Sequence, residues 1–140
     1  MTISHYPLTL FFDGACPVCR HEMTALRRRD RLHRLRFEDV RSERFAQPAG
    51  TTLRDMLEAI HARTAGGRIV AAVEALHLAY GAVGLGWLVA PARWPLLRGA
   101  SERAYRWVAR HRFALPAWVG FAGFALRDRA APCDDDHCAL

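Results

Sequence analysis

With 140 residues, the chain is long enough to form one hydrophobic core and too short for two domains of ordinary size. Its composition, 51% hydrophobic and 24% charged, is average for globular proteins and excludes disordered and collagen-like chains. All 20 basic residues are arginines, which excludes Schiff-base chemistry and phosphate-binding loops that depend on lysine.

The net charge of +6 is spread along the sequence, with its densest basic run at residues 27–36. Such runs are usually solvated helix faces, so we do not expect a nucleic-acid partner. The first six residues lack the basic and apolar regions of a secretory signal, and we therefore expect a cytoplasmic location. In that reducing compartment, paired cysteines are more often catalytic or metal-binding than structural.

The first half of the chain predicts a strand, a helix and a second strand. Residues 8–12 are a short apolar run that ends at an Asp-Gly turn, which is typical of a buried strand. Apolar residues recur at helical spacing over residues 17–29, which predicts an amphipathic helix. Residues 35–38 alternate as a strand does, so we expect the three elements to form a right-handed β-α-β unit.

The middle of the chain predicts a short helix from residue 53 and then a hairpin. Its first strand should begin near residue 59, and Ala65-Gly66-Gly67 supplies a turn into the second strand at residues 68–70. A helix is predicted over residues 72–83, ended by a Gly-Leu-Gly sequence.

The last predicted helix begins near Ser101, a good N-cap residue, and runs to about Arg112. Its inward face should carry Tyr105 and Val108. We expect residues 1–126 to form one domain and residues 127–140, which are charged and poor in apolar side chains, to form a flexible tail.

Two apolar stretches, residues 80–92 and 113–126, fall short of the roughly 20 residues that cross a bilayer. Burial in the core explains them most simply. Because arginines flank the second stretch, association with a membrane surface or a membrane protein is an alternative, and the chain would then be a membrane-associated interaction module.

The sequence Cys16-Pro17-Val18-Cys19 lies where the first strand ends and the first helix begins. With Cys16 as N-cap, Pro17 occupies the first helical position, where a missing N–H is harmless. The amides of Val18 and Cys19 should then point at the Cys16 sulfur, and the helix dipole favours its thiolate. We therefore expect Cys16 to attack and Cys19, one turn inside and shielded by the core, to resolve the mixed disulfide.

Two other interpretations of this pair are open. A static disulfide is a poor stabiliser here, because a ring over two intervening residues removes little entropy from the unfolded chain. A zinc or copper site would need a second ligand pair, and the next cysteine in the sequence is Cys133. A metal-binding protein that uses the pair together with the tail is therefore the main alternative.

The segment Leu10-Phe11-Phe12-Asp13-Gly14-Ala15-Cys16-Pro17-Val18-Cys19 resembles the signature of the DCC family of predicted thiol-disulfide oxidoreductases. The similarity extends over about residues 8–118, through Arg29-Asp30, the Leu35-Arg36-Phe37 strand, the Gly67 hairpin and residues 105–112. The resemblance implies a thioredoxin-like α/β fold, a small mixed sheet flanked by helices, here with extra C-terminal helices. It also implies dithiol exchange with a protein or small-thiol substrate, a reaction for which we expect no cofactor.

Asp13 matches the family's Asp, for which two roles are open. It either satisfies backbone donors in the turn or accepts a proton from the resolving thiol, although its charge would repel a thiolate. The sequence departs from thioredoxins in having no proline just before the third strand, since Pro48 comes too early.

The tail carries Cys133, His137 and Cys138 around three aspartates. These side chains are possible ligands for zinc or copper. A second dithiol relay and an acidic end with incidental cysteines are the other interpretations.

Overall fold

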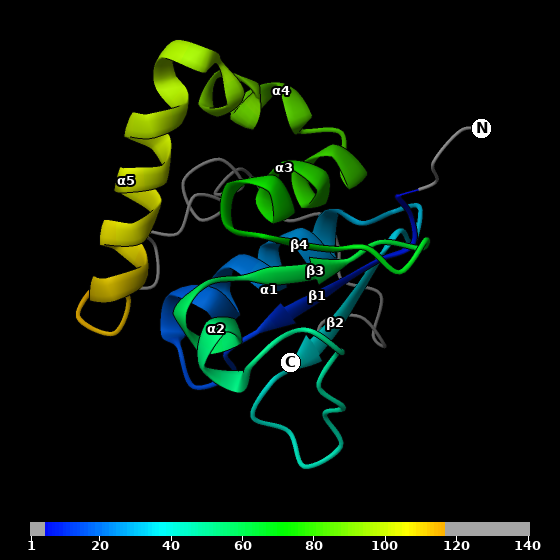
Figure 1. The fold of residues 1–140 in the computed structure, drawn as a ribbon. Helices are drawn as coiled ribbons and strands as arrows, with labels where there is room; N and C mark the ends of the chain where they lie inside the picture. Colours follow the sequence, from blue (N-terminus) through cyan, green and yellow to red (C-terminus); the bar gives the residue numbers. More distant parts are fainter. Residues whose placement is uncertain (1–4, 117–140) are drawn as a thin grey trace.

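The computed structural model describes residues 5–116, in which four strands form one mixed sheet flanked by helices (Figure 1). The elements in chain order are β1 (Leu8–Phe12), α1 (Pro17–Arg29), β2 (Leu35–Asp39), α2 (Leu53–Glu58), β3 (His61–Arg63), β4 (Ile69–Ala71), α3 (Ala72–Ala82), α4 (Gly86–Val89), the 3-10 helix η1 (Ala90–Arg93) and α5 (Pro95–His111). This arrangement confirms the thioredoxin-like fold class, with additional helices after α3.

The sheet has the strand order β2-β1-β3-β4, so β1 is central. β1 runs parallel to β2, with Leu8 opposite Leu35, and antiparallel to β3, with Leu10 opposite Ala62. β3 and β4 form the predicted antiparallel hairpin. The predicted β-α-β unit of β1, α1 and β2 is confirmed, since parallel neighbours need a crossover of this kind.

The two faces of β1 are covered by different helices because successive side chains point to opposite sides. Leu8, Leu10 and Phe12 join a large cluster with α1 and α3 side chains. Phe11, on the other face, packs with Val40 and with Met56 of α2. β1 is buried along its whole length, which fixes the position of the turn that follows it.

Asp30 connects α1 to β2 and explains why the chain reverses there. Its carboxylate is buried and accepts hydrogen bonds from the amides of Arg34 and Leu35, at 2.9 and 2.8 Å. The side chain thus satisfies backbone donors in the connection, as short polar residues do in turns.

The last helix begins earlier than predicted. α5 starts at Pro95, with Trp94 as its N-cap residue, so Ser101 lies inside the helix and the predicted start at Ser101 is wrong. Proline favours the first helical position, and here it takes precedence over the capping preference of serine. Tyr105 and Val108 line the inner side of α5, as predicted.

In Figure 1, α5 stands at one side of the sheet and α4 lies beyond α3. Several large apolar side chains of this helical extension are exposed: Trp87, Trp94, Leu96, Leu97, Trp107 and Phe113. Within residues 5–116, no helix is long and apolar enough to cross a membrane. The proposed division into residues 1–126 and 127–140 falls partly outside the described residues and stays a prediction.

Candidate active site

Cys16 is the N-cap of α1, as the sequence predicted. Its backbone is extended, Pro17 follows at the helix start, and its sulfur accepts a hydrogen bond of 3.3 Å from the Cys19 amide. Of the two amides expected to point at the sulfur, that of Cys19 does so. The cysteine pair therefore lies at the positive end of a 13-residue helix, immediately after the central strand.

The two cysteines are unequal in acidity. The pKa of Cys16 is lowered to about 6, first because the Cys19 side chain hydrogen-bonds to it, and also because of the Cys19 amide and the charge of Arg112. The pKa of Cys19 is raised by its hydrogen bond with Cys16, by burial and by the negative charge of the Cys16 sulfur. At neutral pH the pair thus holds one thiolate, on Cys16, and one thiol, on Cys19.

The exposure of the two sulfur-bearing residues is opposite to the prediction. Cys16 is 0% exposed, whereas Cys19 is partly exposed, so the expectation of an accessible Cys16 and a shielded Cys19 is wrong. The turn returns Cys16 to the end of β1, where its amide donates to the Asp13 carbonyl at 3.1 Å. Cys19, one turn along α1, instead lines a cavity.

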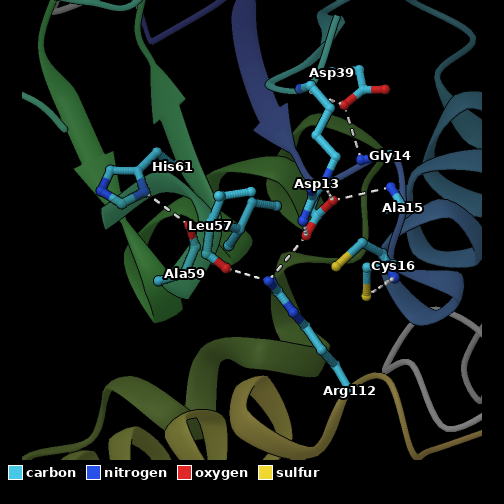
Figure 2. Close-up of polar contacts among 12 residues, drawn as sticks. Asp13, Gly14, Ala15, Cys16, Asp39, Leu57, Ala59, His61 and Arg112 are labelled. Carbon is cyan, nitrogen blue, oxygen red and sulfur yellow. Dashed lines mark hydrogen bonds and ion pairs between the residues drawn. The ribbon is translucent and has the colours of Figure 1, made fainter. Parts of the chain in front are cut away.

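Asp13 lies at the end of β1 with its side chain fully buried. Its carboxylate accepts a hydrogen bond of 3.0 Å from the Ala15 amide and forms an ion pair with Arg112 (Figure 2). It forms a second ion pair with Arg41. Burial alone would raise the pKa of Asp13, but the hydrogen bonds from Arg41 and Ala15 and the charges of both arginines lower it. Of the two roles open for Asp13, it fills the one in the turn, through its hydrogen bond with the Ala15 amide. Its lowered pKa makes it a weak proton acceptor, and a catalytic role for it stays a prediction.

The turn between Asp13 and Cys16 is supported from β2. Gly14 donates a hydrogen bond of 2.9 Å to the carboxylate of Asp39, which also accepts from the Arg41 amide at 2.9 Å. A Cβ atom at Gly14 would lie 1.9 Å from an Asp39 oxygen, so glycine permits this close approach. The Asp-Gly signal in the sequence therefore reflects packing against the end of β2.

A cavity of about 320 Å³ lies between the sheet, α1 and α5. Its walls are mainly apolar, and they include Cys19 and Arg112. Buried Glu22, one turn after Cys19, also lines the cavity and accepts a hydrogen bond of 2.5 Å from the hydroxyl of Tyr80. Burial first, and then the Glu22 charge, raises the pKa of Tyr80. This polar pair was not predicted.

The residue before β3 is Ile60, so no proline faces the dithiol there, as predicted. The Ile60 amide donates a hydrogen bond of 2.8 Å to the hydroxyl of Tyr105 on α5. Burial raises the pKa of Tyr105 to about 12, so this hydroxyl stays protonated at neutral pH. Tyr105 and Arg112 together attach the C-terminal part of α5 to Ile60, which precedes β3, and to Leu57 of α2.

A metal site at the cysteine pair would need further ligands, and the described part of the chain places no such group of ligands there. Among residues 5–116, no group of three or more His, Cys, Asp or Glu side chains is placed to hold a metal ion. Cys133, His137 and Cys138, the proposed tail ligands, lie outside the described residues.

The sequence profile of the DCC1-like thiol-disulfide oxidoreductases matches residues 10–118, which include the cysteine pair, Asp13 and both of its arginine partners. The chain belongs to this family. Family membership confirms the resemblance drawn from the Asp-x-x-Cys-x-x-Cys signature and indicates redox chemistry.

A curated relative from Arabidopsis thaliana is named as the uncharacterized chloroplastic protein At5g50100. It is 27% identical over 143 residues, which cover 97% of this chain and 67% of the relative. No solved structure gives a significant match. The chloroplastic location belongs to the relative, and the cytoplasmic location of this chain stays a prediction.

Sequence reasoning missed Arg41 and Arg112 as partners of Asp13. Both arginines are far from Asp13 in sequence, by 28 and 99 residues. In a chain whose basic residues are all arginine, spacing does not identify the two that pair with the carboxylate. The signal available was the similarity of residues 105–112 to the DCC family, a segment that ends at Arg112.

Proposed function

We propose that this protein is a thiol-disulfide oxidoreductase that exchanges the Cys16–Cys19 dithiol with a disulfide of a substrate protein or small thiol. The observation that carries the proposal is the hydrogen bond from the Cys19 amide to the N-cap sulfur of Cys16. It accompanies a pKa of about 6 at Cys16, which makes that sulfur a thiolate under physiological conditions.

In the first step, the Cys16 thiolate attacks one sulfur of the substrate disulfide. The substrate S–S bond breaks, a Cys16–substrate mixed disulfide forms, and the other substrate sulfur leaves as a thiolate that takes a proton from solvent. Attack at Cys16 requires local opening of the site, because this residue has no exposed surface.

In the second step, Cys19 resolves the mixed disulfide. Once the Cys16 sulfur is bonded to substrate, its negative charge is lost, and that charge is one reason why the pKa of Cys19 is raised. Cys19 then loses its proton to solvent and attacks the Cys16 sulfur. The Cys16–Cys19 disulfide forms, the second substrate thiolate leaves, and two electrons have passed to the substrate. The reverse sequence oxidises a substrate dithiol.

The proposal is tested by equilibrating the full chain in glutathione buffers of graded reduction potential and measuring the mass of the peptide that contains both cysteines. We expect a reversible loss of two protons and two electrons with a single midpoint. The Cys16→Ser and Cys19→Ser variants should show no disulfide within that peptide. A pair that stays reduced throughout, or that is protected by zinc and freed by a chelator, would overturn the proposal in favour of metal binding.

A further inference from the structure

A buried carboxylate beside a nucleophilic sulfur is an electrostatic problem for the proposed chemistry. Asp13 is three residues before Cys16, and its charge raises the pKa of the Cys16 thiol. The Asp13 side chain has no exposed surface, so solvent screens this repulsion poorly. A positive charge close to both groups offsets this repulsion and adds to the effect of the Cys19 hydrogen bonds on the Cys16 thiolate.

The two arginines that pair with Asp13 differ in position. Arg41 follows β2 and is 47% exposed at its side chain, whereas the Arg112 side chain is 12% exposed. Arg112 follows directly after α5, and its guanidinium donates to an Asp13 oxygen at 3.1 Å and to the Leu57 carbonyl. These contacts hold the guanidinium in the interior of the site (Figure 2).

Arg112 also shares a cavity with one of the two cysteines. Its charge lowers the pKa of both Cys16 and Cys19, and it lines the same cavity as Cys19. Arg41, by contrast, contributes to the pKa of Asp13 but is not among the groups that shift either cysteine. The two ion pairs of Asp13 therefore have different consequences for the dithiol.

We propose that Arg112 is a positioning residue of the dithiol, whose guanidinium neutralises Asp13 and supplies the counter-charge for the Cys16 thiolate. The inference rests on the proposed function, since it assigns Arg112 a part in the same exchange reaction. It gives the extra C-terminal helix a role, because α5 carries this charge to the site from 99 residues away along the chain.

The test is the pH dependence of Cys16 alkylation by iodoacetamide in the reduced full-length protein. Arg112→Gln should raise the midpoint of this profile by about one pH unit, which makes alkylation about tenfold slower below the midpoint. Arg110→Gln is the matched control, since it removes the same charge from an exposed position on α5 and should leave the profile unchanged. Arg41→Gln should shift the midpoint by clearly less than Arg112→Gln.

Two further variants separate charge from folding. Arg112→Lys should restore most of the wild-type profile, because it retains a positive charge near Asp13. Adding Asp13→Asn to Arg112→Gln should return the midpoint toward the wild-type value, because the repulsive carboxylate is then also gone. Circular dichroism of each variant confirms that it is folded, and the double variant provides the comparison if Arg112→Gln alone unfolds.

An unchanged profile in folded Arg112→Gln, or an equal shift in Arg41→Gln, would overturn the inference. The glutathione titration of the wild-type protein tests the proposed function independently of Arg112. A reversible disulfide in the wild type together with an unshifted Arg112→Gln profile would refute the role of Arg112 and leave the proposed function intact. Absence of that disulfide would refute the proposed function itself.

Discussion

The backbone amide of Cys19 donates a hydrogen bond of 3.3 Å to the sulfur of Cys16, and the two thiols differ widely in acidity. Cys16, with a pKa of about 6, should therefore react with a small alkylating reagent at pH 7 in preference to Cys19. Mass spectrometry of the labelled peptide gives the site and the rate. The unfolded chain in urea serves as the control, where both cysteines should react with profiles centred near pH 8.5.

The burial of Cys16 opposes this preference, so the experiment shows whether the low pKa of Cys16 or its lack of exposed surface decides which cysteine is labelled. We expect acidity to decide the site of labelling and burial to slow its rate below that of an exposed thiolate. Labelling of Cys19 first would show that access decides the reaction and would reverse the assigned roles.

Replacement of Asp13 by alanine should destabilise the protein by about 2–4 kcal/mol, because it leaves the largely buried Arg112 guanidinium without its carboxylate. Urea unfolding measures the loss. Glu58→Ala is the matched control: it also breaks an arginine–carboxylate pair, but an exposed one, and should change stability by less than about 1 kcal/mol. Similar losses in both variants would contradict a structural role for the buried pair.

The hydroxyl of Tyr105 anchors α5 to the Ile60 amide, so Tyr105→Phe should cost about 1–2 kcal/mol. Hydrogen exchange at Ile60 should become faster in this variant, since its amide loses a buried acceptor. Trp107→Phe, at a position on α5 that is 56% exposed, should leave that exchange rate unchanged. Unaltered exchange in Tyr105→Phe would show that the contact does not hold α5.

Deletion of residues 132–140 should leave folding and exchange chemistry intact, since this segment has little apolar surface. Thermal unfolding and the glutathione titration of the truncated chain measure both. Loss of redox cycling with folding retained would support a second dithiol relay through Cys133 and Cys138.

Local patterns predicted the centre of the fold well. Composition and spacing located three features that each depend on nearby residues in the sequence. These are the apolar run of β1, the helical periodicity of α1 and the glycine turn before β4. The start of α5 was missed because Ser101 and Pro95 are both acceptable helix-start signals, and packing of the helix against the remainder of the chain decides between them.

The site was predictable only in part. The N-cap position of Cys16 follows from the order of strand, proline and helix, and the structure has it. Exposure of Cys16 depends on how the turn packs, and the pairing of Asp13 with Arg112 depends on where α5 lies, so neither follows from spacing along the chain. The missed features are thus the long-range ones.

We propose that Cys16 attacks the substrate and that Cys19 resolves the mixed disulfide, and covalent trapping distinguishes these two roles. Cys19→Ser should accumulate a mixed disulfide between Cys16 and its substrate, because the attacking thiolate keeps its helix terminus while the resolving thiol is gone. Cys16→Ser should trap nothing, because Cys19 lies inside the helix and not at its N-cap, and burial still raises the pKa of its thiol. The adducts are measured by non-reducing electrophoresis and mass spectrometry. Equal adducts with both variants, or none with either, would show that Cys16 and Cys19 are not an ordered attacking and resolving pair.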